Sequence, residues 1–169
     1  QGVSSAASDV YKRQKLKIDE NSILIIRGCG PVGYPGSAEV VNMQPPDRLL
    51  KKGINALPTL GDGRQSGTSE SPSILHVSPE SAVGGDLAIV KTGDKMTIDL
   101  NKRRVDLQIT KLEFIKRRKK KKIKKLTNQT PWQEISRSNV GQLEDGACIM
   151  SRDQYLDITK TKGILRNSH

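Results

Sequence analysis

Short apolar stretches, separated by turns rich in glycine, proline and polar residues, run through the first two thirds of the chain. Residues 22–26 (SILII) form an apolar, β-branched run that predicts a short buried strand. Farther along, apolar and polar residues alternate over three segments with turn sequences between them. This pattern predicts a three-stranded antiparallel meander, with strands at residues 87–91, 95–100 and 104–110 and turns at residues 92–94 and 101–103.

Residues 45–53 carry the signals of a short helix. Prolines stand at the start, an aspartate lies in the first turn, lysines occupy the last turn, and Gly53 follows. Residues 54–60 then predict an extended segment that leads into a polar loop.

Two further helix starts follow from capping patterns. Residues 78–82 (SPESA) predict an N-capped helical turn that ends at Gly84 and Gly85. Thr110 and Glu113 have the spacing of a capping box, so a helix is expected to begin at Lys111.

Composition indicates one domain with an aliphatic core, because the 169 residues are 34% hydrophobic but only 3% aromatic. The formal net charge of +11 is local: nine of the ten residues at 116–125 are basic, and a balance of +2 remains when those nine are removed. Such a run could bind nucleic acid or an acidic membrane surface. No aromatic residues interleave with the lysines as stacking platforms, so a solvated helix face, or an adenine-rich slip in the gene, is the favoured interpretation.

Cys29 and Cys148 are the only cysteines, and their separation gives neither a disulfide framework nor zinc-ligand spacing. Reduced thiols and a cytoplasmic location are the simplest expectation. No apolar run approaches the roughly 20 residues that span a bilayer, and the N-terminus lacks the apolar core of a secretory signal.

Gly28, Gly30 and Gly33 give the pattern G-x-G-x-x-G directly after the first predicted strand. In dinucleotide-binding proteins the third glycine lies within an opening helix. Pro35 and Gly36 oppose a helix at this point, so a nucleotide site is not expected.

The segment at residues 61–73 (GDGRQSGTSESPS) holds three glycines, several hydroxyl groups and almost nothing apolar, so it cannot fill a core. It is typical of a tight loop that brings backbone and hydroxyl groups close to a ligand, with Ser66 uncrowded between Gln65 and Gly67. From composition alone, an ordinary surface turn is the more frequent meaning of such a segment.

Several motifs carry a family resemblance. The segments GDGRQSGTSESPSIL, HVSPESAVGG and, more loosely, GCGPVGYPGSAEVVNM resemble the C-terminal part of the dihydroxy-acid and sugar-acid dehydratases, and within them the aldonate (xylonate or arabonate) branch. TPWQEISRSNVGQLEDGACIM and the final TKGILRNSH are similar to the same branch. The resemblance implies an α/β fold: a β-barrel-like, swivelling β/β/α domain that forms the C-terminal part of a two-domain enzyme.

The implied reaction removes water from a 2,3-dihydroxy acid or sugar acid and gives a 2-keto-3-deoxy acid. On this resemblance Ser66 matches the base that takes the proton at carbon 2, Thr68 matches a substrate-binding hydroxyl, and Glu39 matches a Mg²⁺ ligand. An iron–sulfur cluster is implied as Lewis acid, with its ligands in an N-terminal domain and none among the residues here. A homo-oligomer is implied for the full-length enzyme.

The resemblance and the composition together divide the chain into four parts. Residues 3–14 (VSSAASDVYKRQ) can be encoded by a sequencing-adapter end, so residues 1–14 are expected to be a non-native scar or a natural disordered tail. Residues 15–115 are expected to form the domain core, 116–129 a Lys-rich helix or linker, and 130–169 a helical or extended arm. Trp132, the only tryptophan, is expected to be a packing anchor. The chain would then be a dehydratase fragment that is inactive alone, the alternative being a basic nucleic-acid-binding module.

Overall fold

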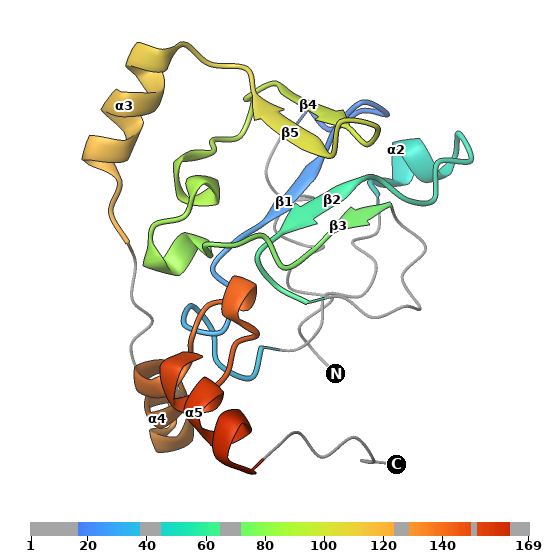
Figure 1. Ribbon diagram of the computed structural model, residues 1–169. Helices are drawn as coiled ribbons and strands as arrows, with labels where there is room; N and C mark the ends of the chain where they lie inside the picture. Colours follow the sequence, from blue (N-terminus) through green and yellow to red (C-terminus); the bar gives the residue numbers. More distant parts are fainter. Residues whose placement is uncertain (1–16, 38–44, 65–71, 124–128, 150–151, 163–169) are drawn as a thin grey trace.

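The computed structural model describes residues 17–37, 45–64, 72–123, 129–149 and 152–162. A three-stranded parallel sheet lies at its centre, in the order β1 (Leu24–Ile26), β2 (Thr59–Gly61) and β3 (Ser73–Ile74). Figure 1 shows α2 (Asp47–Leu50) and α3 (Lys111–Lys120) on opposite sides of this sheet. The mixed α/β class is therefore confirmed. No closed barrel occurs among the described residues, and the barrel-like swivelling arrangement stays an expectation.

The side chains of β1 alternate between two aliphatic clusters, as the pleat of a strand requires. Leu24 packs against one cluster, built on Ile18, Leu49 and Leu57. Ile23 and Ile25 pack against the other, built on Leu60, Leu87 and Val90. The strand predicted at residues 22–26 thus exists, half-buried between two small clusters.

Helix α2 connects β1 to β2 and ends as its sequence predicts. Its buried Leu49 anchors it to the core, and Gly53 has φ +80°, the left-handed conformation that glycine adopts without strain. The Ile54 N–H donates to the Leu49 carbonyl at 3.0 Å and closes the last turn. Residues 54–58 have no regular secondary structure and lead into β2, so the predicted extended segment is seen only at residues 59–60.

The predicted meander is only partly present. β4 (Met96–Asp99) and β5 (Arg104–Leu107) form an antiparallel hairpin, with Met96 opposite Leu107. The first predicted strand is wrong: residues Asp86–Ile89 form the 3₁₀ helix η2. The cause is a contact with Arg27, a residue distant in sequence. Its Nη1 donates to the carbonyls of Leu87, Ala88 and Val90. These three carbonyl groups can point to one guanidinium only if the backbone turns, which an extended strand does not.

Helices α3 and α4 (Pro131–Asn139) begin at side-chain caps, of which the sequence predicts the cap of α3, whereas η1 (Ser81–Val83) begins at Ser81 without a side-chain cap. α3 starts after Thr110, whose Oγ1 accepts a hydrogen bond from the Glu113 N–H at 3.2 Å. α4 starts at a full capping box between Thr130 and Gln133. Two more helices complete the described chain: η3 (Leu143–Asp145) and α5 (Arg152–Lys162). None of the described helices is both long and apolar enough to cross a membrane.

Candidate active site

Two loops leave the same edge of the parallel sheet, since β1 and β2 run side by side in the same direction. The first follows Ile26 and contains the three glycines, and the second follows Gly61 and leads into the segment that carries Ser66. Ligand sites of open parallel sheets form outside the carboxyl ends of the strands. The two sequence motifs singled out above therefore start from adjacent points.

Asp62, the first residue after β2, fastens the two loops together. Its side chain is fully buried. Oδ2 accepts hydrogen bonds from the Gly28 N–H at 3.0 Å and from the Ser81 N–H at 2.8 Å, and Oδ1 accepts one from the Cys29 N–H at 3.0 Å. The Ser81 hydroxyl also donates to Oδ2. Hydrogen bonds to a charged group contribute about 1.5–3 kcal/mol each, so this carboxylate fixes the start of the first loop firmly.

Glu80 holds the second half of the glycine loop in the same way. It is also fully buried, and it accepts hydrogen bonds from the Val32 N–H at 2.9 Å and the Gly33 N–H at 2.8 Å. Its Oε1 accepts a third bond, from Gln142 Nε2 at 2.9 Å. Two buried carboxylates thus take up successive backbone N–H groups of one loop.

The glycine pattern follows from this carboxylate binding. A Cβ on Gly30 would collide with the Glu80 carboxylate, and one on Gly33 would lie 2.7 Å from the Gly28 carbonyl oxygen. Gly28 itself has φ +78°. Residues 31–36 are turns rather than a helix. The expectation that this G-x-G-x-x-G is not a dinucleotide fingerprint is consistent with the structure, because the helix that the fingerprint requires is missing.

Helix α4 covers the far side of the glycine loop and contacts it through polar side chains. Gln133 Nε2 donates to the Pro35 carbonyl at 3.0 Å, and Arg137 Nε donates to the Val32 carbonyl at 2.9 Å. The opposite face is apolar and open to solvent: Trp132 is 79% exposed and Ile135 54%. The expectation that Trp132 is a packing anchor is therefore wrong, because α4 needs its polar side for the loop carbonyls.

The three residues assigned by resemblance, Glu39, Ser66 and Thr68, lie outside the described residues. The structure does describe the residues that lead into these segments, up to Ser37 before Glu39 and up to Arg64 before Ser66 and Thr68. The Asp62 contacts bring the starts of these two loops together. The roles of Glu39, Ser66 and Thr68 stay predictions.

Sequence reasoning missed Asp62 and Glu80, although both stand in recognised motifs. A carboxylate between two glycines at a strand end, and a second one in S-P-E-S, were the available signals. Neither motif shows which distant amides the carboxylate accepts from: the glycine-loop amides lie 33 to 48 residues away, and the Ser81 amide lies 19 residues from Asp62.

The described residues offer no metal centre. They contain no group of three or more His, Cys, Asp or Glu side chains that could hold a metal ion, and the oxygens of Asp62 and Glu80 accept from N–H groups. Cys29 lies beside this network, and burial raises the pKa of its thiol, with the Asp62 charge adding to the rise and a hydrogen bond from Ser37 opposing it. The residues described do not by themselves fit an iron–sulfur cluster or a Mg²⁺ site.

The basic tract is not only a solvated face. Arg117 is 11% exposed, and its guanidinium forms two hydrogen bonds with the Asp94 carboxylate, at 2.6 and 3.0 Å. Its Nε also pairs with Glu113 at 2.7 Å. Lys121, beyond the helix end, donates to the Gly84 carbonyl. Part of the tract therefore anchors α3 to the domain, whereas its neighbours Lys119 and Lys122 are exposed as expected.

Comparison with known proteins identifies the chain's relatives. Residues 3–147 match the model of the dihydroxy-acid/6-phosphogluconate dehydratase C-terminal family. The chain belongs to this family. The match begins within residues 1–14, whose interpretation as a scar or tail stays a prediction.

Individual relatives are sugar-acid and dihydroxy-acid dehydratases. The chain is 52% identical over 159 residues to D-xylonate dehydratase from Caulobacter vibrioides, a match that covers 92% of this chain and 27% of that protein. It is 50% identical over 113 residues to L-arabinonate dehydratase from Rhizobium leguminosarum, covering 64% of this chain and 20% of that protein. It is 39% identical over 108 residues to dihydroxy-acid dehydratase from Archaeoglobus fulgidus, covering 64% and 19%. The chain thus spans about a quarter or less of the length of these relatives.

Proposed function

We propose that this chain is the C-terminal part of a dehydratase that removes water from a 2,3-dihydroxy sugar acid and gives a 2-keto-3-deoxy acid. Family membership supports the dehydratase class. The relatives named for xylonate and arabinonate support a sugar acid as the substrate. By itself the chain is an inactive part of the enzyme, which acts as a cytoplasmic homo-oligomer.

One observation supports placing the active site at the ends of β1 and β2, where the two loops begin. The buried Asp62 ties the loop after β1 to the first residue of the loop after β2. The first loop leads to Glu39 and the second to Ser66 and Thr68. A carboxylate with its oxygens bonded to several N–H groups gives both loops a fixed starting point, which is what a preorganised site requires.

In the proposed reaction Ser66 takes the proton from carbon 2 of the substrate. The C2–H electron pair forms the C2–C3 double bond of an enol, and the hydroxyl at carbon 3 leaves and becomes water on protonation. The enol then tautomerises to the 2-keto acid. Thr68 contacts a substrate oxygen from the same loop and holds carbon 2 within reach of Ser66.

The family resemblance adds Mg²⁺ and an iron–sulfur cluster, and Glu39 is the proposed Mg²⁺ ligand. These groups would supply positive charge that favours departure of the hydroxyl and ionisation of the serine. Because the described residues contain no suitable ligand set, further ligands would come from elsewhere in the full enzyme. A swivelling, barrel-like arrangement of this domain against the remainder is part of the same proposal.

A chimera tests this function. The C-terminal quarter of Caulobacter D-xylonate dehydratase, which is 52% identical to this chain, is replaced by residues 15–169. The chimera should convert D-xylonate to its 2-keto-3-deoxy acid. In it, Ser66→Ala should lower kcat by about 10²–10⁴-fold, as removal of a general base does, and leave KM nearly unchanged.

Ser71→Ala is the matched control, because it removes a hydroxyl from the same loop at a position with no proposed role. It should retain most of the kcat. A Ser66→Ala chimera that keeps more than about a tenth of the kcat, less than a general base contributes, would show that Ser66 is not the base.

A further inference from the structure

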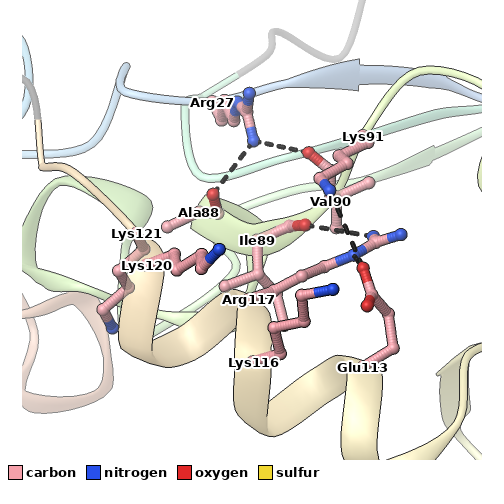
Figure 2. A pocket seen from close by; sticks show the side chains of 10 residues that line it. All are labelled: Arg27, Ala88, Ile89, Val90, Lys91, Glu113, Lys116, Arg117, Lys120 and Lys121. Carbon is pink, nitrogen blue, oxygen red and sulfur yellow. Dashed lines mark hydrogen bonds and ion pairs between the residues drawn. The ribbon is translucent and has the colours of Figure 1, made fainter.

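A cavity of about 370 Å³ lies between α3 and η2, and of the two loops just described only the glycine loop reaches it, through Arg27. Figure 2 shows that basic side chains point into it from three parts of the chain: the end of β1, the segment after η2, and α3. Six cationic side chains line it, against one carboxylate, Glu113. Volumes of this order suit a small ligand.

Three of these cations already have structural partners. Arg117 pairs with Asp94 and Glu113, Arg27 donates to the carbonyls of η2, and Lys121 donates to the Gly84 carbonyl. These three side chains hold the elements that line the cavity together, and their charges are already used in structural contacts.

Lys116 and Lys120 are different. They stand four residues apart on α3, and both line the cavity. Among the residues that the structure describes, neither forms a close ion pair, although Glu113, whose pKa is lowered first by the hydrogen bond from Arg117, also interacts with the charge of Lys116. Like charges at this spacing on a helix are destabilising. Across the cavity, Lys91 Nζ lies 3.7 Å from Glu113 Oε1, whose other partner is Arg117.

We propose that this cavity binds a small anion carrying two or more phosphate groups, through Lys116, Lys120 and Lys91. Lysine binds phosphate as a point charge, and a concave site lined by one sign of charge concentrates the opposite ion. A bridging polyphosphate would neutralise the two lysines of α3 together. The structural use of Arg117 and Lys121 leaves few free cations in a row, which favours a compact ligand over a nucleic-acid strand. The site is independent of the dehydratase assignment.

Calorimetric titration of the chain with inorganic triphosphate tests the site. At physiological salt, triphosphate should bind more tightly than about 1 mM. The double variant Lys116→Gln/Lys120→Gln should weaken this affinity at least about tenfold. ATP should bind at least as tightly as triphosphate, because the phosphate chain is what the lysines recognise.

The control is Lys51→Gln/Lys52→Gln, which removes the same charge from exposed positions after α2, on the other side of the molecule (Figure 1). It should change the affinity by less than about twofold, since screening at this salt weakens distant charges. Circular dichroism verifies that both variants keep their helices.

Three results would overturn the proposal. A dissociation constant for triphosphate weaker than about 1 mM would show that the cavity is not a phosphate-binding site. Equal weakening in both double variants would show that diffuse net charge, and not the cavity, attracts the anion. Affinity for single-stranded RNA that exceeds the triphosphate affinity and rises with RNA length would indicate an extended nucleic-acid surface instead.

Discussion

The side chain of Gln142 and residue Glu80 hold each other by a reciprocal pair of hydrogen bonds. Gln142 Nε2 donates to Glu80 Oε1 at 2.9 Å, and the Glu80 N–H donates to Gln142 Oε1 at 2.9 Å. Through this pair the C-terminal arm completes the partners of the carboxylate that binds the glycine loop. The arm is thereby part of the candidate site's framework.

Gln142→Ala should lower the free energy of unfolding by about 1–3 kcal/mol, because it leaves the part-buried Glu80 N–H without its partner and removes one of the two hydrogen bonds that Glu80 Oε1 accepts. Urea unfolding at neutral pH measures the change. Gln108→Ala, which removes an exposed hydrogen bond to Thr97, should cost less than about 0.5 kcal/mol. Equal decreases in the free energy of unfolding of the two variants would show that the contact with Glu80 stabilises the chain no more than an exposed hydrogen bond does.

Asp62→Asn should destabilise the domain by about 2–4 kcal/mol, because an amide NH₂ group would then face N–H donors that the carboxylate accepted. The exposed Asp86→Asn is the control and should stay within about 0.5 kcal/mol. Amide hydrogen exchange of Gly28 and Cys29 gives a local readout and should accelerate in Asp62→Asn beyond the change in global stability. Unchanged local exchange would contradict the role given to Asp62.

The Asp94–Arg117 pair should make stability depend on pH. The hydrogen bond from Arg117 lowers the pKa of Asp94 below its ordinary value, although partial burial opposes the shift. The carboxylate therefore contributes stability above its unfolded pKa of about 3.9, and this contribution is lost as the pH falls through the lower folded pKa.

Asp94→Asn should accordingly cost about 1–3 kcal/mol at neutral pH, and the deficit relative to the parent chain should shrink as the pH falls below about 4. Urea midpoints measured across this range give the comparison. Asp106→Asn, which removes a more exposed pair with Arg104, should show a deficit below about 1 kcal/mol at every pH. A deficit for Asp94→Asn that is constant with pH would exclude this linkage.

Trp132→Ala should change the free energy of unfolding by less than about 0.5 kcal/mol, because the indole is exposed in this chain. Leu49→Ala, at a residue that is 2% exposed, should cost about 2–5 kcal/mol. Thermal unfolding of the two variants makes the comparison. A large loss in Trp132→Ala would mean that the indole packs against the chain after all.

The sequence by itself determined the features that depend on neighbours a few residues apart. The caps at Thr110 and Thr130, the end of α2 at Gly53 and the turn between β4 and β5 all follow from local hydrogen bonds and backbone preferences. The incompatibility of Pro35 with a nucleotide-binding helix is of the same kind. The motif at residues 61–73, together with the HVSPESAVGG segment, also indicated the family.

Only the tertiary structure decided the features that depend on distant partners. The parallel pairing of β1 with β2, the 3₁₀ form of η2 around Arg27, and the burial of Asp62 and Glu80 against backbone amides each join segments more than 30 residues apart. The exposure of Trp132 belongs with them, because α4 turns its polar face to the loop. Propensity acts on each residue separately, whereas a buried charge or a guanidinium requires several partners at once, and only the folded chain brings them together.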